Sequence, residues 1–421
     1  MSDDTDHLAD TLETAIALKE KGDVPLALKS LQALADSAGI DASSARYELA
    51  VLLLQLGKAE AADEHLCRLG LRYRIAAPLW LNGDSDASIQ HSDVSQSLKE
   101  KVRVFDNILP ADLFEQLQAA LRAPTFWKEH GYPTDIFFSY SLPLPTSDAI
   151  APQTVLERVA ACLRIEAELL AGEECGTVEW WAHRRSGADG GHQLHFDLDE
   201  IALNSGQSLR HPAVSSVLYV DGDGATPTLV TDEDIERSCV ANTGLRCHPR
   251  LNRALFFRGS LLHGVIPKLP KPQSGERITL MLGFWPRSRP PCLSAAPKLN
   301  KARILTNLGP NMSMPTIDIQ PAKRRKVSVP PRKASWPGLL LSPFNGDTVG
   351  EKHVSMHKIE IASCIWEQVT GWSDDMVSRF PAGLITGDFF VNNCILGDRA
   401  RAAAEAAAKP PLDEVEEISI E

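Results

Sequence analysis

An imidazole and a carboxylate lie two residues apart in the segment 190–197. His195 and Asp197 flank Phe196 within a stretch that alternates as a β-strand does. In a strand, residues i and i+2 face the same side, so both polar groups are expected to project together while Phe196 turns the other way. A neighbouring imidazole and carboxylate supply two ligands of the facial triad, which binds Fe(II) and leaves other positions on the metal open. We therefore predict a metal site in this segment.

The third ligand is expected on a later strand, and His263 is the candidate. Apolar residues precede and follow it in the run 261–266, as in a buried strand that carries one polar group. A histidine in such a run is also often a core residue that binds no metal. His192 could compete as a ligand, but its odd separation from His195 predicts the opposite strand face. We expect His192 to be exposed or to support the ligands without binding the metal.

Arg277 opens a strongly apolar strand and lies 14 residues after His263, far enough for the chain to turn and return as a neighbouring strand. Its guanidinium could bind a carboxylate through two parallel hydrogen bonds, which suits the distal carboxylate of 2-oxoglutarate. A structural salt bridge at the end of the strand is the alternative for this arginine.

The ordered combination of His195-x-Asp197, His263 and Arg277-Ile278-Thr279 resembles the iron(II)- and 2-oxoglutarate-dependent dioxygenase superfamily, and within it the prolyl-hydroxylase-like branch. The resemblance covers about residues 101–287. It implies an α+β fold whose catalytic core is a double-stranded β-helix, or jelly roll. The segment 180–185 departs from the pattern expected of a collagen or transcription-factor prolyl hydroxylase, which leaves the substrate open.

The resemblance also implies cofactors and a reaction. Fe(II) would be bound by the two histidines and the aspartate, with 2-oxoglutarate and O₂ as co-substrates and ascorbate as an optional reductant. Arg277 would bind 2-oxoglutarate, with Thr279 and Tyr219 as further contacts, although a packed core tyrosine is an equal alternative for Tyr219. An amino-acid-type substrate, free or in a peptide, would be hydroxylated or otherwise oxidised as succinate and CO₂ are released.

Two other functions stay open. The chain could be a non-catalytic binding module that recruits a partner through helical repeats and a silent β-helix. It could also be a cupin-type metal enzyme that does not use 2-oxoglutarate, for which Arg277 would be dispensable. The basic residues His183, Arg184 and Arg185 either recognise an anionic substrate or form a solvated strand end, and the solvated end is expected.

The N-terminal segment 1–80 is predicted to be helical. It aligns with itself at an offset of 35, as in a repeated helical hairpin with small residues at the crossing and glycine at the turn. The aligned pairs are Ala15 with Ala50, Leu18 with Leu53, Gly22 with Gly57, Ala27 with Ala62, and Leu31 with Leu66. The period resembles that of tetratricopeptide repeats. Because such arrays usually need about three units, we expect a cap on the next domain, with a platform for a peptide or protein partner as the alternative.

Composition divides the rest of the chain. A polar linker is expected at 81–100, the dioxygenase domain at 101–290, and a partly ordered C-terminal extension with a flexible acidic tail at 291–421. A strand is expected at 102–105 and a helix at 111–121. Short apolar runs between turn residues predict further strands at 178–184, 192–198, 214–220, 226–231, 253–258, 261–266 and 277–285.

Charge and targeting patterns restrict the partners. The net charge of −12 argues against general binding to nucleic acid or to an anionic membrane, and no run of residues reaches the roughly 20 apolar residues of a membrane-spanning helix. The start of the chain is acidic and lacks a secretory pattern, and the eight cysteines are scattered, so a cytoplasmic location with reduced thiols is expected. A nuclear location is the alternative if the basic cluster 323–326 acts as an import signal.

Overall fold

The computed structural model describes only part of the chain. The described residues are 11–37, 42–81, 96–124, 126–127, 137–145, 152, 154–185, 191–199, 202, 210–222, 226–235, 241–269, 276–291, 302–305, 353–354, 359–362, 365–372 and 390–391. The basic cluster 323–326 and the acidic tail lie outside them, so the predictions made for these two segments stay predictions.

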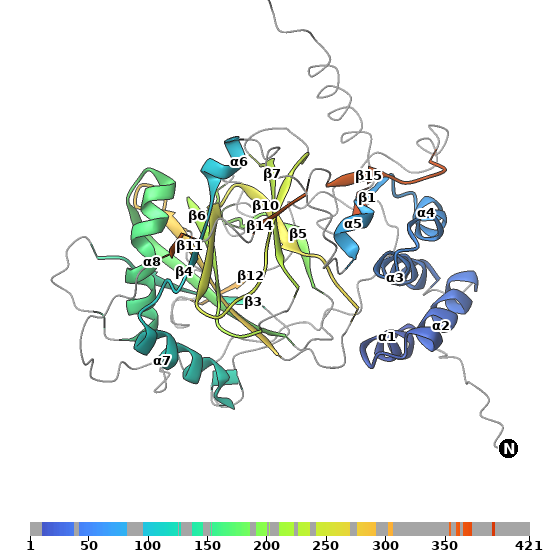
Figure 1. Ribbon diagram of the computed structural model, residues 1–421, viewed down its shortest axis with the longest axis horizontal. Coiled ribbons are helices and arrows are strands. Elements are labelled where there is room, and N and C mark those ends of the chain that lie inside the picture. The colour runs from blue at the N-terminus through green and yellow to red at the C-terminus, as the bar shows by residue number, and fades with distance from the viewer. Residues whose placement is uncertain are drawn as a thin grey trace, which may run out of the picture.

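Two antiparallel sheets form the centre of the molecule (Figure 1). The larger has the order β12-β3-β4-β11-β6-β9-β2-β13, and the smaller has the order β14-β8-β7-β10-β5. The larger contains β2 (Val102–Asp106), β3 (Phe137–Pro143), β4 (Cys175–Arg185), β6 (Val214–Tyr219), β9 (Arg253–Arg258), β11 (Arg277–Pro286), β12 (Ala302–Leu305) and β13 (His353–Val354). The smaller contains β5 (His192–His195), β7 (Thr228–Asp234), β8 (Gly244–Cys247), β10 (Leu261–Val265) and β14 (Ile359–Ala362).

The inner faces of the two sheets pack against each other. One buried apolar cluster joins Val217, Phe257 and Met281 of the larger sheet to Val230 and Leu261 of the smaller. Facing sheets with a shared apolar core make a β-sandwich. The prediction of an α+β fold is therefore confirmed as a mixture of helices with antiparallel sheets.

The outer face of the larger sheet is covered by α7 (Ala111–Arg122) and α8 (Val155–Ala171), which lie together on one side of the sheets in Figure 1. Helix α8 was not predicted, although its signals are present in the sequence. Thr154 and Glu157 form a capping box at its start, and Gly172 ends it with a φ of 74°. The helix packs Val159 and Leu163 against the larger sheet. These residues complete a second buried cluster, which lies between this sheet and the two helices.

The outer face of the smaller sheet is covered by the N-terminal helices, on the opposite side of the molecule (Figure 1). These are α1 (Leu12–Glu20), α2 (Val24–Asp36), α3 (Ala42–Gln55) and α4 (Ala59–Arg68). Their buried leucines and alanines form one cluster with Leu194, Leu229, Leu262 and Ile266 of the sheet and its flanks. The helices therefore share a core with the sheet, while their assignment as a tetratricopeptide-like repeat stays a prediction.

Residues of the C-terminal extension return to both parts of the fold. The strand β14 pairs with β8, and β15 (Trp366–Gln368) pairs with β1 (Tyr73–Ile75), which also pairs with β16 (Phe390–Val391). Ile365 and Val369 are buried in the core of the N-terminal helices. The extension thus links the helices to the smaller sheet.

Two short helices flank the predicted linker. Helix α5 (Ala77–Trp80) precedes it, and α6 (Gln96–Lys101) begins within its last residues. Leu98 of α6 is fully buried against the inner cluster, which explains why this stretch is ordered despite its polar composition. Across the described part of the chain, no helix combines the length and the apolar character needed to cross a membrane.

Candidate metal centre

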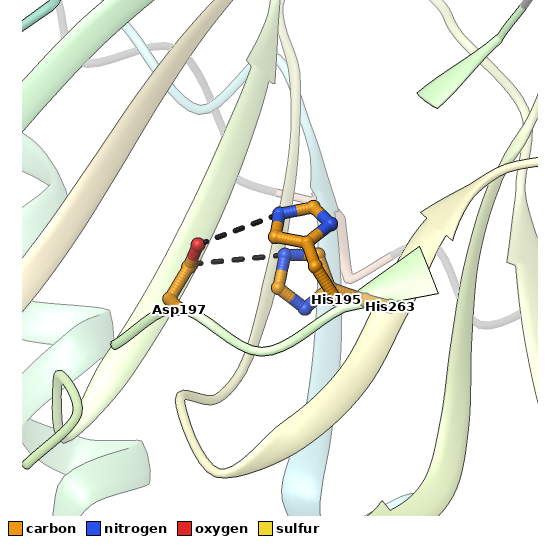
Figure 2. Close-up of side chains that lie close together, drawn as sticks. All are labelled: His195, Asp197 and His263. Atoms are coloured by element: carbon orange, nitrogen blue, oxygen red, sulfur yellow. Dashed lines mark ion pairs between the residues drawn. The ribbon is translucent and has the colours of Figure 1, made fainter. Parts of the chain in front are cut away.

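The structure brings His195, Asp197 and His263 together (Figure 2). His195 is the last residue of β5, and Asp197 follows just beyond the strand end. His263 lies in β10, directly opposite His195 in the strand register. The Nε2 atom of His195 lies 3.6 Å from Oδ1 of Asp197, and Nε2 of His263 lies 3.7 Å from Oδ2. One ligand atom from each residue lies within 4.8 Å of the others.

The backbone fixes the orientation of both imidazoles. Nδ1 of His195 donates to the carbonyl oxygen of Gln193 at 2.9 Å, and Nδ1 of His263 donates to that of Leu261 at 3.0 Å. A neutral imidazole that donates through Nδ1 keeps its lone pair on Nε2. Burial, followed by the neighbouring His195, lowers the pKa of His263 to about 4, so this ring is neutral near pH 7. The Nε2 atoms of both rings therefore face the carboxylate.

A hydroxyl group holds the carboxylate of Asp197. Ser215 of β6 donates to Oδ2 of Asp197 at 2.6 Å. Burial alone would raise the pKa of this carboxyl, but His263, His195 and the Ser215 hydroxyl together favour the charged form and leave the pKa below its ordinary value. The site therefore contains one anion held between two imidazoles and a serine hydroxyl.

This donor set fits a divalent transition metal. Two imidazole nitrogens and one carboxylate oxygen are the ligands of the facial triad of non-haem Fe(II). Adjacent ligands of an octahedral ion lie about 3 Å apart when each bond is about 2.1 Å long. Closing the observed separations onto one ion therefore needs side-chain shifts of only about 1 Å. Within the residues that the structure describes, His195, Asp197 and His263 are the histidine, cysteine and carboxylate side chains that lie close enough together to hold a metal ion.

His192 lies beside the metal candidates, and the prediction of the opposite strand face is wrong. Its ring centroid is 4.5 Å from that of His195. The register pairs His263 with His195 and Val265 with His192, so β5 carries one extra residue over this interval. Such a β-bulge turns an odd separation into the same face. The strict alternation on which the prediction rested does not hold here.

Arg277 points into the space between the sheets and is half-buried. Nη1 donates to the carbonyl oxygen of Thr226 at 3.0 Å, and Nη2 donates to the hydroxyl of Thr228 at 3.1 Å. Its buried Nε has no hydrogen-bond partner, and no carboxylate of the described residues forms an ion pair with it. Burial lowers the pKa of the guanidinium. The strand-end salt bridge proposed as the alternative is made instead by Arg184 with Glu276.

Tyr219 lies behind Arg277. Its hydroxyl is 2.8 Å from Oγ1 of Thr228 and 3.1 Å from the carbonyl oxygen of Cys247, and the guanidinium carbon of Arg277 lies 5.6 Å from the ring centroid. The side chain is fully buried. It therefore supports Arg277 through its ring and through Thr228, while its hydroxyl is engaged in the core. Thr279 is buried next to Tyr219 in the register of β11 and β6.

The three basic residues at the end of β4 do not behave alike. Arg184 faces outward and pairs with Glu276, as expected of a solvated strand end. His183 and Arg185 face inward, because residues two apart share a face. The ring of His183 lies 5.6 Å from that of His192, and Arg185 donates to His192. The solvated-end interpretation is wrong for these two residues.

Sequence reasoning did not identify Ser215, because its role depends on which residue of β6 lies nearest to the segment after β5. It also did not identify Gly264. A Cβ at this position would lie 2.8 Å from the carbonyl oxygens of both His192 and Gln193, so glycine is needed where the bulge of β5 approaches β10. The two consecutive glycines at 190–191, directly before a strand, were the signal in the sequence that could have indicated the bulge.

Comparison with known proteins gives similarity in structure over about half of the chain. No family model and no curated sequence matches the chain. A prolyl-4-hydroxylase from Pseudomonas putida covers 44% of this chain and 88% of its own, with 17% identity and a TM-score of 0.29. HygX from Streptomyces hygroscopicus, solved with nickel and 2-oxoglutarate bound, covers 46% and 87% with 16% identity and a TM-score of 0.30.

A third similar structure is a prolyl hydroxylase from Trichoplax adhaerens in complex with a peptide of a hypoxia-inducible factor. It covers 45% of this chain and 85% of its own, with 11% identity and a TM-score of 0.29. Over about half of its length, the chain is similar in structure to solved 2-oxoglutarate-dependent oxygenases.

Proposed function

We propose that this protein is an Fe(II)- and 2-oxoglutarate-dependent oxygenase with a double-stranded β-helix core. The observation that carries the proposal is the convergence of His195, Asp197 and His263, with each imidazole fixed through Nδ1 so that Nε2 faces the carboxylate. Such fixed orientation is typical of metal ligands, whose second ring nitrogen is usually hydrogen-bonded to the protein. A core histidine that binds no metal would have no need of a facing carboxylate and a second imidazole.

In this proposal the three side chains occupy one face of the ion. Their strands approach from the smaller sheet, and Ser215 of the larger sheet holds the carboxylate between them. The positions on the ion that these three side chains leave free would take the co-substrate and O₂. The residues of the site would fix the position of the ion and the orientation of the co-substrate bound to it.

Arg277 would bind the distal carboxylate of 2-oxoglutarate. A guanidinium removed from water is costly unless an anion compensates it, and no described carboxylate does so. The Tyr219 ring and the Thr226 and Thr228 oxygens hold the group in place without neutralising it. A dicarboxylate bound to the metal at one end would supply the missing charge at the other.

When bound, Fe(II) couples the oxidative decarboxylation of 2-oxoglutarate to insertion of oxygen into a C–H bond. One atom of O₂ would enter succinate and the other would enter the hydroxylated product, with release of CO₂. The ring of Phe257, whose centroid lies 4.5 Å from that of His263, would limit the access of water to the site. We propose an amino-acid-type substrate, free or within a peptide.

The test uses the full chain under anaerobic conditions, followed by exposure to O₂. We expect one Fe(II) to bind per chain, 2-oxoglutarate to bind only to the metal-loaded protein, and succinate to form slowly once O₂ is admitted. His195→Ala and His263→Ala should abolish metal binding while circular dichroism shows a folded protein. A metal-loaded protein that does not bind 2-oxoglutarate would indicate a cupin-type enzyme, and one that binds neither would indicate a binding module.

A further inference from the structure

Two glycines build the bulge that places His192 beside the metal candidates. Gly191 has a φ of 78°, and a Cβ there would lie 2.4 Å from the carbonyl oxygen of Val265. Gly264 is equally constrained by the carbonyl oxygens of His192 and Gln193, each 2.8 Å from a Cβ at that position. Bulges commonly redirect a side chain next to an active site. The local sequence is therefore arranged so that His192 shares the face of His195.

Arg185 fixes the hydrogen-bonding state of His192. Its Nη2 lies 3.2 Å from Nδ1 of His192, and its Nη1 donates to the carbonyl oxygen of Gly191. Because a guanidinium can only donate, Nδ1 of His192 must accept. The ring is then neutral with its proton on Nε2. The two ring nitrogens point in divergent directions, so the Nε2–H donor is directed away from Arg185.

The ring of His192 lies next to the candidate metal ligand His195. The ring of His192 meets that of His195 edge to face, with an angle of 77° and a centroid distance of 4.5 Å. The ring of His183 also lies beside that of His192, with a centroid distance of 5.6 Å. A ligand that accepts a hydrogen bond from Nε2 of His192 would therefore lie close to the ring of His195.

Arg185 and Arg277 serve different sides of the site. The two residues are partners in the register of β4 and β11, but their guanidinium groups diverge. Arg277 reaches the threonines next to β7, whereas Arg185 reaches the start of β5. In the smaller sheet, β7 and β5 flank β10, the strand that carries His263. The two guanidinium groups thus lie on opposite sides of the candidate metal ligands.

We propose that His192 and Arg185 form a second carboxylate-binding subsite, in which Nε2–H of His192 donates to the carboxylate and Arg185 fixes the donor and adds positive charge. The subsite rests on the proposed function for its role in the reaction. Two sources of the carboxylate share this chemistry: the metal end of 2-oxoglutarate, and the substrate itself. A substrate carboxylate held here would fix the position of its neighbouring C–H bonds relative to the metal.

The first experiment measures anaerobic binding of two 2-oxo acids to the Fe(II)-loaded full chain. 2-Oxoglutarate and 2-oxovalerate share the metal end, and only the former has a distal carboxylate. If the subsite binds the metal end, His192→Phe and Arg185→Gln should weaken both acids by about tenfold or more, as expected for a hydrogen bond to a charged group. Arg184→Gln is the matched control, because Arg184 lies on the same strand and faces outward.

The second experiment tests the substrate as the source. Acetate is the probe and acetamide is its neutral control, and the paramagnetic broadening of their methyl proton signals by Mn(II) bound in place of Fe(II) reports proximity to the metal. If the subsite binds a substrate carboxylate, acetate should be broadened in the presence of 2-oxoglutarate, and His192→Phe and Arg185→Gln should remove this broadening. Arg184→Gln should retain it.

The outcomes are decisive for the subsite. Loss in the first experiment assigns it to the co-substrate, and loss in the second assigns it to the substrate. If both variants match wild type in both experiments, the subsite is refuted. The acetate measurement is repeated with Mn(II) alone, so the subsite can be judged even if wild-type protein binds neither 2-oxo acid. That last result would refute the proposed function separately.

Discussion

His195 and His263 are cross-strand partners whose ring centroids lie 4.3 Å apart. Each ring donates through Nδ1 to the carbonyl oxygen two residues earlier in its own strand. The orientation of each imidazole is therefore local, whereas their meeting depends on the pairing of β5 with β10. A shift of that register by one residue would separate the two rings, because neighbouring residues of a strand face opposite sides.

Ser215→Ala should weaken metal binding by about 10- to 100-fold, because it removes the hydroxyl that orients the Asp197 carboxylate. The measurement is competition for Co(II) or Fe(II) against a chelator of known affinity. Ser216→Ala is the control, since Ser216 is buried on the same strand but donates to the carbonyl oxygen of Leu282 on the other face. Equal losses in the two variants would mean that Ser215 acts only through stability.

Arg277→Ala should weaken 2-oxoglutarate binding by about 10- to 150-fold, which corresponds to the roughly 1.5–3 kcal/mol of a charge-assisted hydrogen-bonded pair. Arg277→Lys should restore part of the affinity, because an ammonium lacks the planar fork of the guanidinium. Anaerobic titration of Fe(II) and of 2-oxoglutarate separates the two effects, and Fe(II) affinity should barely change. Unchanged 2-oxoglutarate affinity in the Ala variant would remove this assignment.

Arg74→Met should lower the free energy of unfolding by about 3–5 kcal/mol, because it leaves a buried carboxylate without its cation. Nε of Arg74 lies 2.7 Å from Oδ1 of Asp63, and the two side chains are 6% and 1% exposed. Lys19→Met, which breaks the more exposed pair with Glu48, should cost about 1 kcal/mol or less. Denaturant titration compares the two variants, and similar losses would contradict the difference in burial.

Deletion of residues 1–80 should make the remaining chain poorly soluble or unstable. The helices cover apolar side chains of the smaller sheet, among them Leu229 and Leu262, and deletion would expose them to water. Size-exclusion chromatography and thermal unfolding would show the loss. If the helices instead form only a substrate platform, the truncated protein stays folded and converts 2-oxoglutarate without substrate. Full activity of a soluble truncated protein would contradict both interpretations.

The sequence predicted the strands around the candidate site because each is a short apolar run between turn residues. The expected strands at 253–258 and 261–266 agree with β9 and β10 to within one residue. The opposing orientation of Phe196 was also predicted, and this residue packs toward the core of the N-terminal helices. Where an apolar run was bounded by turn residues, the sequence was sufficient for these elements.

The remaining features depend on contacts between distant segments. The position of His192 follows from a bulge, and Ser215 meets Asp197 only through the packing of one sheet on the other. The short strands β8 and β14 have little pattern of their own and are stabilised by pairing with each other across a large sequence separation. No local periodicity encodes such partners.

The pairing of β1 with β15 has a consequence for how the protein is made. Arg74 and Glu367 are bonded across a sequence separation of 293 residues, and Ile365 and Val369 complete the core of the first helices. A ribosome synthesises the N-terminal helices long before it reaches these residues, although domains usually fold in the order in which they emerge. The core of the first helices can therefore be completed only after residues 365–369 have been translated. A chain arrested before residue 365 would lack the strand that closes this core.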